Sequence, residues 1–246
     1  KRLLHHLFPD EDSREYVLSW CHHAITSRND TILCFIGERA TGKTLFMEFM
    51  EKGFGKRYYE LLSKSFFGTF NGNIKEKRLA VLEEVTVEDD EHVNILKRIT
   101  NDTIPIEAKG KDSVTLPNYM SLVLINNHLK GLRIEPLERR FSVVDIGNVP
   151  LAKTYSKEDF ELITQLKNTR DDEEPHEIIV NFFHWLTKTY KPKYDNKAPF
   201  KKEYFYKVVY EGLHSWKKEI INYIRELGVR GVPFKLSDLR KYSKAR

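Results

Sequence analysis

Helical spacing of apolar residues is the first pattern along the chain. Residues 10–27 open with acidic residues, and their apolar side chains then recur every three or four positions. This spacing predicts a helix, because residues three and four apart share one helical face. The same spacing predicts helices at 45–55, 91–100, 156–168 and 177–190, and a helix, turn and helix at 215–246.

Short apolar runs that end in polar residues or glycine are the second pattern. They predict buried strands at 32–36, 79–85, 121–125 and 141–147. Strands that alternate with helices predict an α/β fold, a largely parallel sheet with helices on both faces.

Two further kinds of segment complete the pattern. Residues 104–119 contain two short strand-like stretches around a Lys-Gly-Lys turn, which predicts a projecting hairpin. Residues 58–78 predict a loop, and the Pro- and Lys-rich residues 191–204 predict irregular chain.

The character of the chain changes near residue 148, where predominantly helical spacing takes over. We therefore expect an N-terminal helical segment at 1–30, a core at 31–147 and a mostly helical C-terminal subdomain at 148–246. The end of that subdomain resembles the start of a winged-helix or helix-turn-helix module, and a plain helical subdomain is the alternative.

Composition sets limits on these expectations. The chain has 246 residues, 40% of them hydrophobic, which suits a globular protein with a substantial core. A net charge of +5 permits nucleic-acid binding but does not require it.

Location follows from what the sequence lacks. It has no apolar stretch of membrane-spanning length, and Cys21 and Cys34 lack metal-ligand spacing. We expect no membrane contact and a reducing, cytoplasmic location, in the host cell if the protein is viral. Because the chain has no initiating Met, we also expect it to be a piece of a longer protein.

A glycine-bearing loop follows the first predicted strand and fits the pattern G-x-x-x-x-G-K-[ST]. It consists of Gly37, Glu38, Arg39, Ala40, Thr41, Gly42, Lys43 and Thr44. Glycines allow a tight curl that aims backbone N–H groups at one phosphate chain, and the following helix adds the positive end of its dipole. This predicts that Lys43 reaches the β- and γ-phosphates and that Thr44 binds Mg²⁺; the alternative is a glycine turn without function.

Polar residues follow the later strands. Glu83 and Glu84 end the 79–85 run, where one carboxylate can orient Mg²⁺ and the other can polarise the attacking water. Asn127 follows the 121–125 run, and an amide there can position that water. Arg139 and Arg140 carry guanidinium groups suited to stabilising a transferring phosphoryl group. The alternatives are a solvated strand end for the glutamates and local ion pairs for the arginines.

The order GERATGKT, LEEV, LINNH and ERRF resembles superfamily 3 helicases, over about residues 10–147. The likeness is to the helicase parts of phage, plasmid and large-virus primase-helicases and primase-polymerases. It implies a P-loop NTPase core of AAA+-like architecture, a hexameric ring, and ATP with Mg²⁺ as cofactors. It also implies that Glu83 and Glu84 are the acidic pair, that Thr44 and Glu83 serve the metal, that Asn127 is the sensor, and that Arg139 or Arg140 acts on the neighbouring subunit.

The predicted hairpin resembles the lysine-bearing hairpin of the same family, which implies that Lys109 or Lys111 contacts the DNA backbone. A lysine at the tip of a hairpin can reach a polyanion and bind phosphates without sequence preference. The alternative is a solubilising turn.

The leading hypothesis is an ATP-dependent DNA helicase or translocase that works as a ring in phage or mobile-element replication. Its expected partners are single-stranded or forked DNA, further copies of itself in a hexamer, and a primase or polymerase within the same longer chain. One alternative is an ATP-binding DNA-binding or assembly module of a primase-polymerase that does not unwind DNA. Another is a P-loop kinase for a small substrate, and DNA-stimulated turnover separates the first hypothesis from both.

Overall fold

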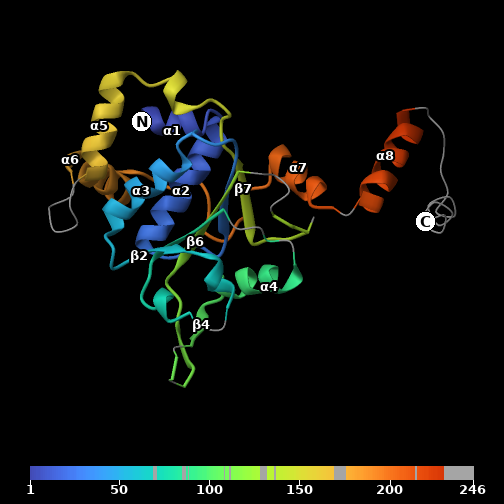
Figure 1. Cartoon of the computed structure of the whole chain (residues 1–246), viewed down its shortest axis with the longest axis horizontal. Coiled ribbons are helices and arrows are strands. Elements are labelled where there is room, and N and C mark those ends of the chain that lie inside the picture. The colour runs from blue at the N-terminus through green and yellow to red at the C-terminus, as the bar shows by residue number, and fades with distance from the viewer. Residues whose placement is uncertain are drawn as a thin grey trace.

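A parallel sheet lies at the centre of the molecule, with helices on both sides (Figure 1). The computed structural model describes residues 1–68, 71–84, 87, 89–107, 109–110, 112–127, 132–135, 137–168, 176–213 and 215–229. Its five parallel strands have the order β2-β3-β6-β1-β7. In chain order they are β1 (Ile32–Ile36), β2 (Tyr59–Leu62), β3 (Leu79–Glu83), β6 (Ser121–Asn126) and β7 (Phe141–Asp145).

Both faces of the sheet are buried, which explains why its inner strands are apolar throughout. Side chains alternate between the faces, so that Leu33 and Phe35 of β1 point to one side and Cys34 to the other. The face of Leu33 packs against α1 (Arg2–Leu7), α2 (Glu11–Thr26) and α3 (Lys43–Phe54). The face of Cys34 packs against α4 (Asp90–Ile99) and α7 (Glu203–Glu211).

Helices from the second half of the chain pack against this core. Helices α5 (Lys157–Asn168) and α6 (Glu177–His184) contact α3, and a π-helical turn (Trp185–Thr189) contacts α2. The carbonyls of Leu186 and Tyr194 hydrogen-bond the rings of His22 and His23 at 2.7 and 2.9 Å, so these histidines have packing roles. Helix α8 (Ser215–Val229) extends away from the body (Figure 1).

A two-stranded antiparallel hairpin leaves the body below the sheet in Figure 1. Its strands are β4 (Thr103–Ile106) and β5 (Val114–Pro117), as expected from the sequence. Short 3₁₀ turns at Lys64–Phe67, Gly72–Ile74 and Leu151–Lys153 complete the connections.

Most predicted elements are confirmed, and several differ. Residues 58–78 were predicted as a loop, which is wrong, because they include edge strand β2, where only Tyr59 and Leu62 face the core. Strands β3 and β7 end at Glu83 and Asp145 rather than at residues 85 and 147. Helices α1 and α7 were not predicted, and α7 begins at Glu203, within residues 191–204, which were predicted as irregular chain. Residues 230–246, which hold the second helix of the predicted helix-turn-helix, lie outside the described residues, and the domain boundaries stay a prediction.

Cys21 and Cys34 are free and buried, and burial raises the pKa of the Cys21 thiol to about 12. In the described part of the chain, no helix has the length and apolar character needed to cross a membrane.

Candidate functional site

The carboxyl ends of β1, β3 and β6 meet at one edge of the sheet and enclose a small pocket. Its volume is about 270 Å³. Most of its lining comes from the residues singled out in the sequence, namely Arg39, Ala40, Thr41, Gly42, Lys43, Thr44, Glu83, Glu84 and Asn127, and Leu45, Ile125 and Leu151 complete it. We call residues 37–44 the glycine loop and Glu83 with Glu84 the acidic pair. The structure thus brings the glycine loop, the acidic pair and Asn127 together.

The glycine loop is tightly curled. Gly42 has φ of 103°, and Ala40 has φ of 60°, a left-handed conformation that is uncommon for a residue with a side chain. A Cβ on Gly42 would lie 2.9 Å from Cδ1 of Leu151, whose N–H donates to the carbonyl of Ala40 at 2.9 Å. A Cβ on Gly37 would lie 3.0 Å from the carbonyl oxygen of Ile146. Gly37 is therefore needed for close packing against backbone, and Gly42 is needed chiefly for its left-handed conformation.

Helix α3 begins within the glycine loop, and its N-terminus is capped differently from those of α2 and α4. Asp10 caps α2 and Asp89 caps α4 through side-chain hydrogen bonds, and both helices carry acidic residues in the first turn. The N-cap of α3 is Gly42, with no capping side chain and no acidic residue in the first turn. The first N–H groups of a helix lack intrahelical partners, so this end offers donors and positive potential to an anion in the pocket.

Lys43 lies inside the loop and is buried. Its ammonium donates to the carbonyls of Gly37 and Glu38 at 2.7 and 2.6 Å. Burial lowers the pKa of Lys43, and the carboxylates of Glu38 and the acidic pair oppose that shift. The loop therefore holds a cation that donates hydrogen bonds to two neutral carbonyls, which an anion can replace.

The acidic pair faces the loop from the end of β3. Burial raises the pKa of Glu83 above its ordinary value, Glu84 and Glu48 add to the rise, and a hydrogen bond with Thr44 opposes it. Glu84 has φ of 52°, and its Oε1 accepts a hydrogen bond from the Asn127 amide at 2.9 Å. Two pairs, Thr44 with Glu83 and Asn127 with Glu84, thus join the start of α3 and the ends of β3 and β6 into one polar cluster.

Arg139 and Arg140, the arginine pair, lie at the opposite edge of the sheet. The carbonyl of Arg140 accepts a hydrogen bond from the N–H of Ile32, which begins β1, whereas the glycine loop follows the end of that strand. A strand of five residues separates the two edges by about 16 Å. Arg139 is exposed, and Glu138 pairs with Arg140 at 3.5 Å. The arginine pair therefore does not join the pocket of its own chain.

Lys109 of the hairpin also lies away from the pocket. Lys109 precedes Gly110, whose φ of 74° forms the turn beyond β4. Lys111 lies outside the described residues.

The sequence analysis missed three pocket residues, Leu45, Ile125 and Leu151, and Leu151 is the least expected of them. It lies in a 3₁₀ turn outside every motif and reaches the loop only through the fold. No signal in the sequence marks it.

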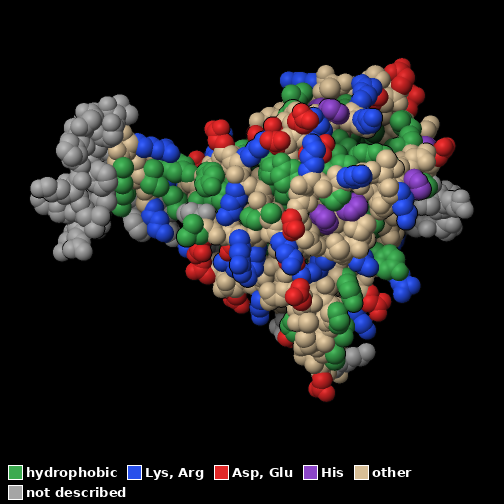
Figure 2. Space-filling model, turned by 180° about the vertical axis from the view of Figure 1, so that it is seen from behind, with side chains coloured by type: hydrophobic (Ala, Val, Ile, Leu, Met, Phe, Trp, Pro, Cys, Tyr) green, Lys and Arg blue, Asp and Glu red, His purple; other side chains and the backbone are tan. Residues whose placement is uncertain are grey.

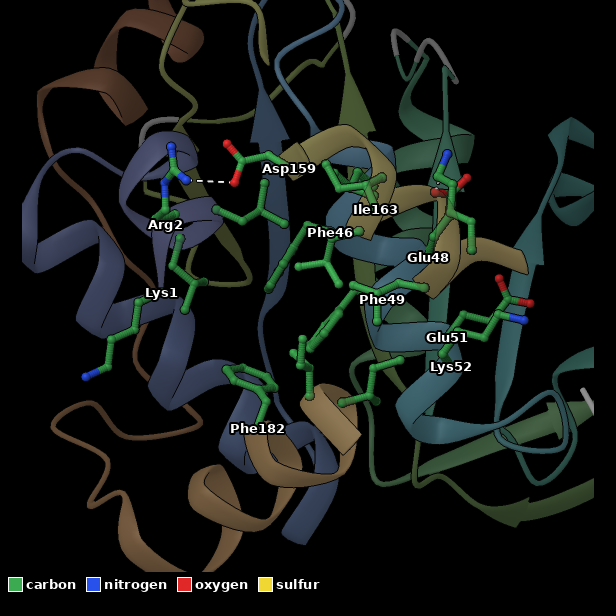
Figure 3. A pocket seen from close by; sticks show the side chains of 18 of the residues that line it. Lys1, Arg2, Phe46, Glu48, Phe49, Glu51, Lys52, Asp159, Ile163 and Phe182 are labelled. Carbon is green, nitrogen blue, oxygen red and sulfur yellow. Dashed lines mark hydrogen bonds and ion pairs between the residues drawn. The ribbon is translucent and has the colours of Figure 1, made fainter. Parts of the chain in front are cut away.

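A second and larger cavity of about 700 Å³ lies between α1, α3, α5 and α6 (Figure 3). Phe46, Phe49, Ile163 and Phe182 line it in Figure 3, and an ion pair between Arg2 and Asp159 at 2.7 Å lies on its rim. Leu45 lines both cavities, so the apolar space begins beside the polar pocket.

No group of three or more His, Cys, Asp or Glu suited to a metal ion occurs among the residues that the structure describes. A divalent cation at this site would have few protein ligands, with hydroxyls, water or a bound phosphate completing its coordination.

Comparison with known proteins places the site in context. A protein family of unknown function, DUF5906, matches residues 35–140, which include the glycine loop, the acidic pair and Asn127. The DNA primase-polymerase of Nitratiruptor phage NrS-1 is 25% identical over 158 residues, which make up 61% of this chain and 22% of that protein. The chain therefore spans about a fifth of the length of this relative.

Solved structures of the NrS-1 C-terminal region have the same fold. One apo structure matches with a TM-score of 0.71 at 20% identity, over 87% of this chain and 51% of the other. A second apo structure, described as the A form, matches with a TM-score of 0.74 at 20% identity, over 98% of this chain and 59% of the other.

Proposed function

We propose that this chain is an ATP-hydrolysing motor domain of the superfamily 3 helicase type, with an AAA+-like P-loop core, that acts on DNA during replication. The observation that carries the proposal is the convergence of the glycine loop, the acidic pair and Asn127 on one pocket. The similarity to a phage primase-polymerase supports a replication context and a place within a longer chain that also holds primase or polymerase parts.

The loop and the start of α3 would bind the triphosphate. The uncapped N–H groups of α3 would donate to phosphate oxygens, and Lys43 would exchange its two carbonyl partners for the β- and γ-phosphates. The apolar cavity that begins at Leu45 offers space for the adenine base.

Thr44 and Glu83 are suited to Mg²⁺, since their side chains already lie within hydrogen-bond reach of each other beside the loop. Mg²⁺ keeps several waters and takes one or two protein oxygens together with substrate phosphates, so a site of this size fits it. When bound, the ion would supply charge neutralisation at the phosphates.

Glu84 and Asn127 are suited to the attacking water. The carboxylate of Glu84 would accept its proton, and the amide that now donates to Glu84 would orient it. A general base contributes about 10²- to 10⁴-fold to such a step.

The arginine pair would complete the site of a neighbouring subunit. Its position at the opposite edge of the sheet prevents it from reaching the pocket of its own chain, so catalysis would depend on a ring, which we expect to be a hexamer. The hairpin, with Lys109 at its turn, would project toward DNA in the centre.

The test is steady-state ATP hydrolysis with and without single-stranded DNA, for the wild type, Glu84→Gln and the exposed control Glu161→Gln. We expect DNA to raise turnover, Glu84→Gln to lower it at least 100-fold, and the control to match the wild type. Tight ATP binding without turnover, in assembled protein with magnesium present, would instead favour a nucleotide-dependent assembly module. Turnover that DNA leaves unchanged would refute the motor.

A further inference from the structure

Three segments that precede strands lie side by side at the amino edge of the sheet. Tyr58 immediately precedes β2, Arg78 immediately precedes β3, and Tyr119 lies two residues before β6. The N–H of Arg78 donates to the carbonyl of Tyr58 at 2.8 Å, and the N–H of Ser121 donates to the carbonyl of Arg78 at 2.8 Å. The hydrogen bonds bring together residues that are far apart in the sequence.

Two exposed tyrosines at this edge each lie against an arginine. Tyr58 is 41% exposed and Tyr119 is 54% exposed. The guanidinium carbon of Arg57 lies 5.5 Å from the ring centroid of Tyr58, and that of Arg78 lies 5.3 Å from the ring centroid of Tyr119. Exposed aromatic rings and arginine planes are the groups on which proteins stack unpaired bases.

Basic residues are frequent in the segments that precede β2 and β3. The two short segments 56–57 and 75–78 contribute five cations, namely Lys56, Arg57, Lys75, Lys77 and Arg78. The acids nearby are engaged by these cations: Glu60 pairs with Lys77 at 3.0 Å, and Glu76 lies 3.8 Å from Arg57. We call Arg57, Tyr58, Lys75, Arg78 and Tyr119 the basic–aromatic patch.

The patch adjoins the base of the hairpin. Tyr119 follows β5 by two residues. The side chain of Asn71 donates to the carbonyl of Pro105 in β4 at 2.9 Å and accepts from the N–H of Glu107, the residue after β4, at 2.8 Å. The segment 71–78 therefore runs from the hairpin to the patch. Figure 2 shows Lys and Arg side chains on the body close to where the hairpin projects.

We propose that the basic–aromatic patch is a binding site for single-stranded nucleic acid, in addition to the hairpin. Tyr58 and Tyr119 stack on bases, while Arg57 and Lys75 contact phosphates. Exposed aromatic rings favour this partner over an acidic protein, which the charges alone would attract. The site goes beyond the proposed motor and binds without ATP hydrolysis, so a failure of one leaves the other standing.

The first experiment separates stacking from charge. Fluorescence anisotropy measures binding of a labelled dT 20-mer and of an abasic 20-mer of equal charge to the 246-residue chain. Tyr58→Ala with Tyr119→Ala should weaken dT binding at least fivefold and leave abasic binding unchanged. Tyr58→Phe with Tyr119→Phe should keep wild-type binding, as should Tyr206→Ala, which removes an equally exposed tyrosine from α7.

A salt titration tests the phosphate contacts. Arg57→Ala with Lys75→Ala should reduce the slope of log K against log salt by about 1.4 for a single strand, whereas Lys157→Ala on α5 should not change it. Absence of binding to the dT 20-mer by the wild type would overturn the proposal. Equal losses for dT and abasic strands in the tyrosine-to-alanine variant would overturn it too, because the patch would then act through charge alone.

Discussion

Glu138 lies immediately before the arginine pair and holds that segment in place. It is 8% exposed, and its Oε1 accepts hydrogen bonds from the N–H groups of Arg139 and Arg140 at 2.9 and 3.0 Å. Its other oxygen pairs with the ammonium of Lys97, on α4, at 2.9 Å. One carboxylate thus ties the arginine pair to α4, and removing it should weaken the fold as well as the position of the arginines.

The contacts allow the size of the effect to be worked out. Glu138→Gln keeps an oxygen that can accept from the N–H groups of Arg139 and Arg140, but it loses the ion pair with Lys97. Breaking a buried pair costs about 3–5 kcal/mol, and because the Lys97 side chain is 22% exposed and can turn toward water, we expect about 2 kcal/mol. Glu138→Ala also loses two hydrogen bonds at about 1 kcal/mol each, for a total loss of about 4 kcal/mol.

Urea denaturation at pH 7 measures these losses, and a double-mutant cycle with Lys97→Met isolates the pair. We expect a coupling energy of about 2 kcal/mol between Lys97→Met and Glu138→Gln. Glu161→Gln, which removes a surface pair with Lys157 at 3.9 Å, should change stability by less than about 0.5 kcal/mol. A coupling energy between Lys97 and Glu138 below about 0.5 kcal/mol, the size expected of a surface pair, would refute the reasoning.

The pH dependence of the same variants gives a second check. Burial alone would raise the pKa of Glu138, but the hydrogen bonds from Lys97 and the backbone N–H groups outweigh it and lower the pKa below 4.5. A carboxyl with a lowered folded-state pKa stabilises the protein above its unfolded-state pKa and loses that effect as the pH falls. The difference in the free energy of unfolding between the wild type and Glu138→Gln should therefore become smaller below about pH 4.5.

Three further outcomes are expected. Gly42→Ala, at φ of 103° and against Leu151, should lower stability by about 1–3 kcal/mol and ATP affinity at least tenfold, by urea denaturation and nucleotide titration. Asp10→Ala should lower the free energy of unfolding by about 1 kcal/mol at pH 7, whereas Asp10→Asn should keep most of the wild-type stability. Because the hydrogen bond from Ser13 lowers the pKa of Asp10 to about 2, the stability lost in Asp10→Ala should become smaller as the pH falls from 3.8 toward 2, as measured by urea denaturation. A Lys43→Ala subunit with an intact arginine pair should partly restore hydrolysis to a subunit whose arginine pair is replaced by alanine, and no recovery in defined mixed rings would contradict the proposed action between subunits.

The sheet and the pocket follow from local signals in the sequence. The apolar runs that became β1, β3, β6 and β7 end in glycine or polar residues, and parallel strands place such ends at one edge. The glycine loop leads directly into the next helix, which predicts that the N-terminus of α3 lies at the loop. For these reasons the approach of Glu83 and Asn127 to the loop could be predicted without knowing the strand order.

Other features depend on contacts between distant segments and carry no local signal. Strand β2 has only two buried side chains, so its pattern is too short to distinguish from a loop. Leu151 reaches the pocket because the chain after β7 passes over the loop, a path that no residue type marks. The patch around Tyr58 and Tyr119 arises only when three strands pair in register, although its two runs of basic residues are visible in the sequence.

Strands β3 and β6 connect the two edges of the sheet, and this geometry limits how the proposed motor could couple its sites. β3 follows Arg78 and ends at Glu83, and β6 lies between Tyr119 and Asn127. Both strands are buried almost throughout, and close-packed strands transmit strain but do not stretch. A change at the proposed nucleotide pocket would therefore reach the edge that carries the proposed DNA-binding patch as a rigid-body movement of the whole subunit. Since the arginine pair also lies at that edge, the interface with a neighbouring subunit is where such a movement would be driven.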